Sequence, residues 1–410
     1  MAQASLSDRA QVRAALPLIV VAGVIISLSM GIRQSMGLFQ KPMAVDLGIS
    51  ASEFGFGMAL QNLMWGVSQP VVGALGDRFG PRPVLLGGTL VYAAGLLLMA
   101  LSPSTLLGLD FGGGVLIGIG VAATGFGVLL GAVSAAVPPA KRSWAVGIVS
   151  GAGSVGTMVI APFGQAIIGA FDWQWALLAY MAIAALMGMF SVFVPRSGYR
   201  AGPAALGASQ STREALGEAL GHRGYVAMTV AFFACGFQLM FIGTHFPRYL
   251  AMCGLAPSIS AASLALIGGC NAIGSYMFGM LGTRYDKSKL LAGIYLTRTV
   301  AIITYLIVPI SAPSTLIFAS VMGFTWLGVS PLVSGLISGI FGLRHFNMLY
   351  GVVFLGHQAG AFTGALMGGV VLDYTGSYQD AWYALIAIGV AAAALQWPMD
   401  TRPVRRMAAA

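Results

Sequence analysis

Apolar residues fill this chain in long stretches of roughly 20 residues, separated by short polar segments. Twelve such stretches follow one another, at 14–40, 54–75, 83–101, 107–137, 143–170, 173–195, 224–250, 259–282, 289–308, 313–341, 346–371 and 380–398. A helix of this length crosses the hydrocarbon core of a bilayer. The alternating ten-residue pattern of membrane strands is absent from the sequence, and unpaired backbone groups are too costly in lipid. We therefore expect an all-α membrane protein with twelve transmembrane helices.

The composition excludes a soluble protein. Of the 410 residues, 58% are hydrophobic and only 8% are charged, and the mean hydropathy is +0.86. A soluble domain carries about a quarter charged residues, because its whole surface meets water. Cys235, Cys253 and Cys270 are too few and too scattered for a disulfide framework or a metal cluster. We therefore expect free thiols and no metal site. The sequence also lacks the G-x-x-x-x-G-K-[ST] motif of ATP-binding loops, and we expect no cofactor.

The basic residues fall almost entirely on alternate loops between the apolar stretches. Only Lys41 and Arg248 lie on the other set of loops. The majority are Arg9, Arg13, Arg78, Arg82, Lys141, Arg142, Arg196, Arg200, Arg213, Arg223, Arg284, Lys287, Lys289, Arg344, Arg402, Arg405 and Arg406. Loops rich in Lys and Arg stay in the cytoplasm, so this bias predicts a multi-pass inner (plasma) membrane protein with both termini cytoplasmic. The net charge of +9 then reflects topology and contact with anionic lipid, not nucleic-acid binding.

The longest polar interruption divides the chain into two halves that repeat each other. It predicts a six-helix bundle at 1–195, a cytoplasmic linker at 196–223 and a second six-helix bundle at 224–410. GALGDRF at 73–79 recurs as GMLGTRY at 279–285, and Gly147 and Gly156 recur as Gly351 and Gly360. Such parallel repeats are typical of transporter halves related by an axis along the membrane normal. Within the linker, Ser211 and Glu214 have capping-box spacing, which is compatible either with a short interfacial helix or with a plain linker.

The stretch GALGDRFGPRP at 73–83 resembles the loop motif of the major facilitator superfamily. The matched positions are Gly73, Leu75, Asp77, Arg78, Gly80 and Arg82. GIRQSMGLF at 31–39 and GHQAGAFTGALMGGVVLDYTGSY at 356–378 resemble its monocarboxylate-transporter-like branch. The resemblance implies two pseudo-symmetric six-helix bundles, acting as a monomer, that alternate access around a site between them.

The same resemblance implies a gating role for Asp77, Arg78 and Arg82. In the family fold Asp77 would lie near the start of span eleven, where its carboxylate could meet the positive end of a helix dipole. The alternative is a solvated loop charge. The second half has Thr283 at this place, so any such latch is one-sided.

Arg33 stands within the first apolar stretch, where a charge is costly. An arginine there costs roughly 2.5 kcal/mol or more unless it faces a partner or a wet cavity. No acid shares its stretch and none lies near the middle of any other, which suggests that the missing anion is the substrate. Snorkelling to the outer headgroups is the alternative. The resemblance favours the first reading, because monocarboxylate transporters have a basic residue at the matching position.

Further candidates for the site are polar or aromatic residues in the central spans two, eight, ten and eleven. They are Asn62, Asn271, Ser275, Trp326 and His357. His357 either serves as a titrating group in the cavity or satisfies itself on a neighbouring helix. Gly356, Gly360, Gly364 and Gly368 recur every four residues and predict close helix packing.

Two other polar residues of the predicted spans keep more than one interpretation. Arg298 lies in the middle of span nine, where the family architecture favours a structural role. His245 lies one turn before Arg248 at the outer end of span seven, where it serves either a capping or a gating role.

Two families that resemble this chain differ from it at polar positions of spans eight and eleven, which bears on the charge of the substrate. Animal monocarboxylate transporters place an Asp and an Arg in span eight, where this chain has Asn271 and Ser275. Oxalate/formate antiporters carry basic residues in spans eight and eleven, and this chain has neither, which disfavours a dianion.

The sequence therefore predicts a secondary transporter of a small organic monoanion and not an enzyme. Its partners would be the anion, membrane lipid and, if transport is coupled, protons; symport and antiport stay open. The alternative function is a proton-driven exporter of drugs or metabolites, which the lack of a mid-membrane acid disfavours. A membrane enzyme or receptor would need a catalytic constellation or a soluble domain, and the sequence has neither.

Overall fold

The computed structural model describes residues 2–102, 104–138, 142–196, 211–342 and 345–404, and the regular structure in these ranges is helical. The first half comprises α1 (Ala2–Gln34), η1 (Met36–Phe39), α2 (Gln40–Leu47), α3 (Ala51–Phe79), α4 (Pro81–Leu101), η2 (Thr105–Leu116), α5 (Ile117–Thr124), α6 (Phe126–Ala136), α7 (Arg142–Ala170) and α8 (Trp173–Ser191). The linker contains α9 (Thr212–Gly221). The second half comprises α10 (Arg223–Met252), α11 (Pro257–Arg284), α12 (Lys287–Ile307), α13 (Ala312–Thr325), α14 (Val329–Phe341), α15 (Phe346–Thr375) and α16 (Gln379–Gln396).

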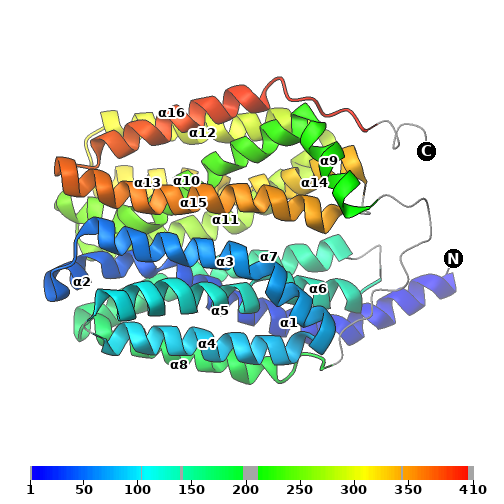
Figure 1. The fold of residues 1–410 in the computed structure, drawn as a ribbon, viewed down its shortest axis with the longest axis horizontal. Coiled ribbons are helices and arrows are strands. Elements are labelled where there is room, and N and C mark those ends of the chain that lie inside the picture. The colour runs from blue at the N-terminus through cyan, green and yellow to red at the C-terminus, as the bar shows by residue number, and fades with distance from the viewer. Residues whose placement is uncertain (1, 103, 139–141, 197–210, 343–344, 405–410) are drawn as a thin grey trace.

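The long helices run side by side along one axis, and their connections lie at the two ends of the bundle (Figure 1). In the described residues, nine helical stretches are long and apolar enough to cross a membrane. The other three predicted spans correspond to α3, α15 and α16, which lie along the same axis and contain polar residues such as Gln61 and Gln358. All twelve predicted spans thus correspond to helical segments, which confirms the predicted fold class.

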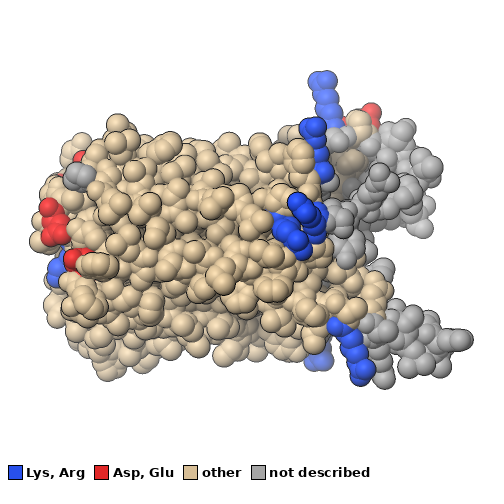
Figure 2. Space-filling model, turned by 90° about the horizontal axis from the view of Figure 1, so that it is seen from below, with Lys and Arg blue, Asp and Glu red and all other residues tan. Residues whose placement is uncertain are grey.

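Charged side chains gather at the two ends of the molecule. Figure 2 shows Lys and Arg mainly at the end that also holds both chain termini in Figure 1, and Asp and Glu mainly at the opposite end. We call these the termini end and the far end. On the face that Figure 2 shows, the surface between them is almost free of charge, as a lipid-facing belt requires.

Three of the predicted spans are interrupted. The first span ends as an α-helix at Gln34 and continues through η1 and α2. Span four breaks at Gly125 between α5 and α6, and span ten breaks at 326–328 between α13 and α14. Spans four and ten are repeat equivalents, so their breaks lie at corresponding positions of the two halves. Paired breaks of this kind are a feature of transporter binding sites.

Closely crossing helix pairs repeat in the two halves. A Cβ added to Gly156 of α7 would lie 1.7 Å from the carbonyl oxygen of Ser27 of α1, which no side chain can occupy. In the second half a Cβ on Gly360 of α15 would lie 2.0 Å from the carbonyl oxygen of Phe233 of α10. The next residue of the glycine stripe, Gly364, is equally close to Phe237 of α10, at 2.2 Å. These contacts confirm that the stripe serves helix packing.

The short helix predicted within the linker is α9. The Ser211 side chain accepts from the Glu214 N–H, and the Glu214 carboxylate accepts from the Ser211 N–H, so the capping box is formed. Residues 197–210 of the linker lie outside the described residues.

The two halves contact each other from the middle of the bundle to the far end. At the far end, the Asp373 carboxylate of α15 accepts from the N–H groups of Ala51 and Ser52, at 3.0 and 2.7 Å, at the start of α3. A carboxylate at a helix N-terminus is stabilised by the helix dipole and by the unpaired N–H groups. Here the acid belongs to one half and the helix to the other, so this interaction links the two halves at the far end.

His245 of α10 adds a second link between the halves at the far end. Its Nε2 donates to the carbonyl oxygen of Ala365 at 2.6 Å, and its Nδ1 lies 3.2 Å from Nε2 of Gln40 and 3.1 Å from the hydroxyl of Tyr378. Since Nε2 carries the proton, Nδ1 accepts. Gln40 comes from the first half, so His245 joins the halves and is not a surface cap.

Candidate substrate site

Arg33 lies in the last turn of α1. The regular α-helix ends after Arg33, at Gln34. In the following turn, the Ser35 hydroxyl donates to the carbonyl oxygens of Gly31 and Ile32, at 3.0 and 2.9 Å. A cation in the last turn is favoured by the negative end of the helix dipole. The helix dipole therefore offsets part of the free-energy cost of placing a charge here.

The partners of the Arg33 guanidinium are few and uncharged. Nη2 donates to Oδ1 of Asn62 in α3, and it lies 3.4 Å from Sδ of Met240 in α10. The guanidinium carbon stands 4.6 Å from the centre of the Trp65 ring, in cation–π geometry. Nε is buried without a hydrogen-bond partner. Within the described residues no acid pairs with Arg33, so its charge is available to an anion.

A chain of hydrogen bonds continues from Arg33 into the second half. The Gln358 amide of α15 donates through Nε2 to the backbone oxygen of Asn62 at 3.0 Å. Its Oε1 therefore faces Nδ1 of the neighbouring His357, 3.1 Å away. Because Oε1 can only accept, Nδ1 of His357 carries the proton and Nε2 is the basic nitrogen. Three predicted site residues, Arg33, Asn62 and His357, thus belong to one network that spans both halves.

Aromatic rings surround this network. The Trp65 ring meets Phe354 edge to face at 5.4 Å, and Phe354 stacks on the His357 ring at 5.8 Å with an interplanar angle of 3°. Phe232 of α10 lies 4.9 Å from the same imidazole. Arg33, His357 and Phe354 are each only half-buried although they lie in the interior of the bundle. These three side chains therefore keep surface that a ligand can contact.

Asn271 and Ser275 lie in a different network. The Asn271 amide donates to the Ser154 hydroxyl of α7 at 2.9 Å, and its Oδ1 accepts from the N–H of Leu327 at 2.9 Å and from the Ser275 hydroxyl at 3.1 Å. Asn271 is buried and its hydrogen-bonding groups are used. The pair joins α7, α11 and the break in span ten, so its geometry is that of a helix tie.

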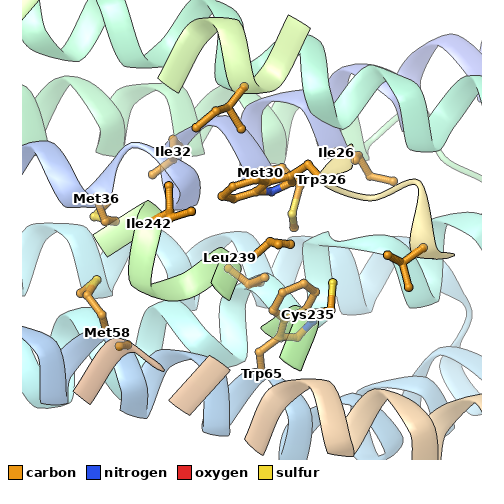
Figure 3. Packing of buried hydrophobic residues seen from close by; sticks show 14 of the residues in the cluster. Ile26, Met30, Ile32, Met36, Met58, Trp65, Cys235, Leu239, Ile242 and Trp326 are labelled. Atoms are coloured by element: carbon orange, nitrogen blue, oxygen red, sulfur yellow. The ribbon is translucent and has the colours of Figure 1, made fainter. Parts of the chain in front are cut away.

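Trp326 stands at the break in span ten, and its side chain is 6% exposed within the central hydrophobic cluster. Figure 3 shows its ring in the middle of the bundle together with Met30, Leu239 and Trp65. It remains a candidate for contact with the substrate on the side of the second half.

Arg298 is fully buried beside the same break. Its Nη2 donates to the backbone oxygens of Thr325 and Trp326, the latter at 2.7 Å, and its Nη1 lies 3.5 Å from Sγ of Cys235. These carbonyls are free because α13 ends there, and the end of a helix carries partial negative charge. The geometry agrees with a structural role, since the charge is already satisfied by protein groups.

The predicted gating residues lie at the termini end. The Asp77 side chain lies outside the described residues. Arg78 is exposed, with its guanidinium 5.1 Å from the Phe79 ring, and Nε of Arg82 donates to the carbonyl oxygen of Val194 at 2.6 Å. Gly80 makes the turn between α3 and α4 with a φ of 86°, which explains the glycine in the motif.

Two residues that contact Arg33, Trp65 and Met240, are not predicted from the sequence. Trp65 follows Asn62 by three residues on α3 and therefore lies on the same helix face, a signal that could have identified it. Met240 comes from the other half, and no spacing in the sequence pairs it with Arg33.

Comparisons with known proteins agree with this architecture. The sequence model of the Major Facilitator Superfamily matches residues 19–339. Human monocarboxylate transporter 11 is 28% identical over 376 residues, covering 86% of this chain and 75% of that protein. The oxalate:formate antiporter of Oxalobacter formigenes is 24% identical over 403 residues, covering 95% and 93%.

Solved structures show the same fold. A variant of the nucleoside transporter NupG superimposes with a TM-score of 0.74 at 12% identity, covering 94% of this chain and 99% of that one. A bacterial homologue of the human lysosomal transporter Spinster, in an inward-facing and unoccupied conformation, gives a TM-score of 0.72 at 14% identity, covering 93% and 94%. At this level of identity the likeness concerns the fold alone.

A helical bundle of two repeated halves, with a polar network across their interface, defines a membrane transporter and not an enzyme. This chain belongs to the Major Facilitator Superfamily, and its relatives confirm the resemblance to the monocarboxylate-transporter-like branch.

Proposed function

We propose that this transporter carries a small organic monoanion and binds its carboxylate at Arg33. The observation that carries the proposal is the half-buried guanidinium of the first span, whose Nε has no partner and which no acid of the described chain neutralises. Carboxylates pair with guanidinium groups through strong, charge-assisted hydrogen bonds. The names of the relatives, which include monocarboxylate transporters and an oxalate:formate antiporter, support an organic acid.

A single negative charge fits the site better than two. The other arginine in the middle of the bundle, Arg298, already donates to the carbonyl oxygens at the end of α13. A second carboxylate would have to compete with these carbonyls or lie unpaired in a desolvated site, which is costly.

Alternating access would work by rocking the two halves about the Arg33–His357 network. The contacts of Asp373 with α3 and of His245 with Gln40 close the far end. With the termini in the cytoplasm, as the basic loops predict, this conformation would be inward-facing. The substrate would then exchange with the cytoplasm, and opening the far end would require breaking the Asp373 interaction.

Proton coupling would use His357. Its basic Nε2 has no hydrogen-bond partner in the described part of the chain, and its Nδ1 is linked through Gln358 and Asn62 to Arg33. A proton on Nε2 would add a second positive charge to the site and strengthen anion binding. The alternative, exchange of anions without protons, needs only Arg33.

Counterflow in proteoliposomes tests the function directly. Vesicles loaded with one unlabelled acid should accumulate the same acid in labelled form from outside, whereas empty vesicles should not. Lactate, benzoate and formate represent monoanions, and oxalate represents a dianion. Counterflow of at least one monoanion but not of oxalate supports the proposal, and its absence for all the acids would refute it.

The second candidate, a proton-driven exporter of drugs or metabolites, has support from one relative named a fujikurins efflux protein, which is 25% identical over 363 residues. It predicts proton-gradient-dependent movement of neutral or cationic compounds. Ethidium accumulation in inverted vesicles energised by a pH gradient would favour the exporter, since an Arg33 site repels a cation.

A further inference from the structure

The side chains around Arg33 indicate which chemical group the substrate carries next to its carboxylate. The Arg33 guanidinium lies over the Trp65 ring and 3.4 Å from the thioether sulfur of Met240. Phe354 packs against Trp65, and Phe232 packs against His357. Phe354 and Met240 keep accessible surface in the interior of the bundle. The side chains that a substrate can contact near the guanidinium are therefore aromatic or apolar.

The polar groups of the site are almost all occupied. Oδ1 of Asn62 accepts from Arg33, and its Nδ2 donates to the carbonyl oxygen of Met58 at 2.8 Å. Both ends of the Gln358 amide are used as well, one by Asn62 and one by His357. In the described residues, what remains for a ligand is Nη1 and Nε of Arg33 and Nε2 of His357. A substrate with several hydroxyl groups would leave them unpaired against aromatic walls.

From this arrangement we infer that the substrate is an aromatic monocarboxylate, with its carboxylate at Arg33 and its ring packed against Trp65 and Phe354. This inference rests on the proposed function and narrows its substrate class. Aromatic rings attract each other in edge-to-face and offset geometries, and they gain by burial next to apolar side chains. A short hydrophilic acid would use the guanidinium and leave these walls without a partner.

Arg298 does not offer a rival position for the acid. It is fully buried, and its donors meet the Thr325 and Trp326 carbonyls. The ring would therefore extend from Arg33 along the aromatic side of α3 and α15, where Phe354 stands between Trp65 and His357.

Binding of two matched acids to the purified full-length transporter in nanodiscs tests the inference. Benzoate and acetate carry the same carboxylate and differ in the ring. We expect benzoate to bind at least tenfold more tightly than acetate, measured by displacement of labelled benzoate. Benzyl alcohol, which keeps the ring and lacks the charge, should not displace it.

Two leucine variants locate the ring. Phe354→Leu should weaken benzoate binding at least threefold and leave acetate binding unchanged, because Phe354 does not contact Arg33. Phe324→Leu makes the same change on α13, beside Phe278 and away from the site, and should alter neither acid. If benzoate keeps its affinity in folded Phe354→Leu, the assignment of the ring to this wall is wrong.

The outcomes separate the two levels of the proposal. Equal affinity for acetate and benzoate, with both lost in Arg33→Ala, would refute the aromatic class and leave the anion site intact. Failure of both acids to bind the folded wild-type protein would refute the proposed function itself.

Discussion

At the scale of single residues, the arginines of spans one and nine are stabilised in different ways. Arg298 donates to the free carbonyls at the end of α13, so its charge is matched by a helix dipole and by hydrogen bonds. Arg33 also lies at a helix end, but it has one amide, one thioether and one aromatic face, and its Nε is unpaired. The first arrangement is complete without a ligand, and the second is not.

The residue-scale prediction concerns His357. Histidine is the side chain that ordinarily changes charge between about pH 5 and 8. If protons are co-transported, uptake in the wild type should rise as the pH falls, because protonated Nε2 strengthens anion binding. His357→Gln keeps a hydrogen-bonding side chain beside Gln358 but cannot titrate, so it should flatten this pH profile and preserve anion exchange.

Uptake measured from pH 5.5 to 8 in both proteins provides the comparison. His222→Gln, at the N-cap of α10 and outside the central network, is the matched control and should keep the wild-type profile. Identical profiles in the wild type and His357→Gln would remove His357 from the coupling mechanism.

At the scale of helices, equivalent residues perform equivalent structural tasks in the two halves. The Tyr92 hydroxyl of α4 donates to the carbonyl oxygen of Ser29 in α1, at 3.0 Å. Arg298 and Cys235, which lie 206 positions further along the chain in each case, form the corresponding contact at 3.5 Å. In both halves the third span therefore ties the first span close to the break in the fourth. Arg298 replaces a tyrosine in this scheme and also caps the broken helix.

This comparison predicts a graded loss of stability. Arg298→Met leaves the carbonyls of Thr325 and Trp326 unpaired and should lower the melting temperature most, because each hydrogen bond from a charged donor contributes about 1.5–3 kcal/mol. Arg298→Lys should be intermediate, since an ammonium cannot reproduce the planar fork. Tyr92→Phe removes one neutral bond worth about 0.5–1.5 kcal/mol. Melting in detergent gives the order, and an unchanged melting temperature in Arg298→Met would contradict the capping role.

Two glycines of one helix provide a matched test of helix packing. A Cβ on Gly364 would lie 2.2 Å from a carbonyl oxygen of α10, whereas nothing lies within 4 Å of a Cβ on Gly351. Gly364→Ala should destabilise the fold by roughly 1–3 kcal/mol through overpacking. Gly351→Ala should be neutral or stabilise the helix by about 0.5–1 kcal/mol. Equal melting temperatures for the two variants would show that α10 and α15 are not so tightly packed.

The sequence predicts the spans well because each follows from the length of an apolar stretch. It does not predict the breaks at Gly125 and at 326–328, because the apolar pattern continues across them and tertiary contacts decide where the backbone bends. Arg33 and Asn62 could be selected from the sequence because they are polar residues within apolar stretches. The sequence does not predict that Arg33 contacts Asn62 or that Asn271 contacts Ser154. These contacts depend on how each helix is rotated about its axis, which the polarity of a residue does not determine.

At the scale of the whole molecule, the two halves are linked at the far end. Asp373 links the end of α15 in the second half to the start of α3 in the first, and the His245–Gln40 contact lies beside it. Asp77 would serve the termini end in the family scheme, so the two acids would favour opposite conformations. This division of roles is a prediction, because it requires the molecule to adopt a second state.

Asp373→Asn should shift the population towards a state that is open at the far end. The amide has no negative charge for the dipole of α3 and offers only one acceptor oxygen to its two N–H groups. Spin labels at the exposed residues Val45 and Ser258, one from each half, would report a longer distance. The background should carry alanine at Cys253 and Cys270 to prevent unwanted labelling. An unchanged distance distribution would exclude Asp373 as a latch.

We propose that Arg33 binds the carboxylate of the transported anion, and counterflow of labelled benzoate through Arg33 variants measures this role. Arg33→Ala should insert and fold, because it removes a costly buried charge, yet its counterflow should fall to the level of empty vesicles. Arg33→Lys keeps the charge without the planar fork and should retain part of the activity. Wild-type counterflow kinetics in well-folded Arg33→Ala would contradict the account.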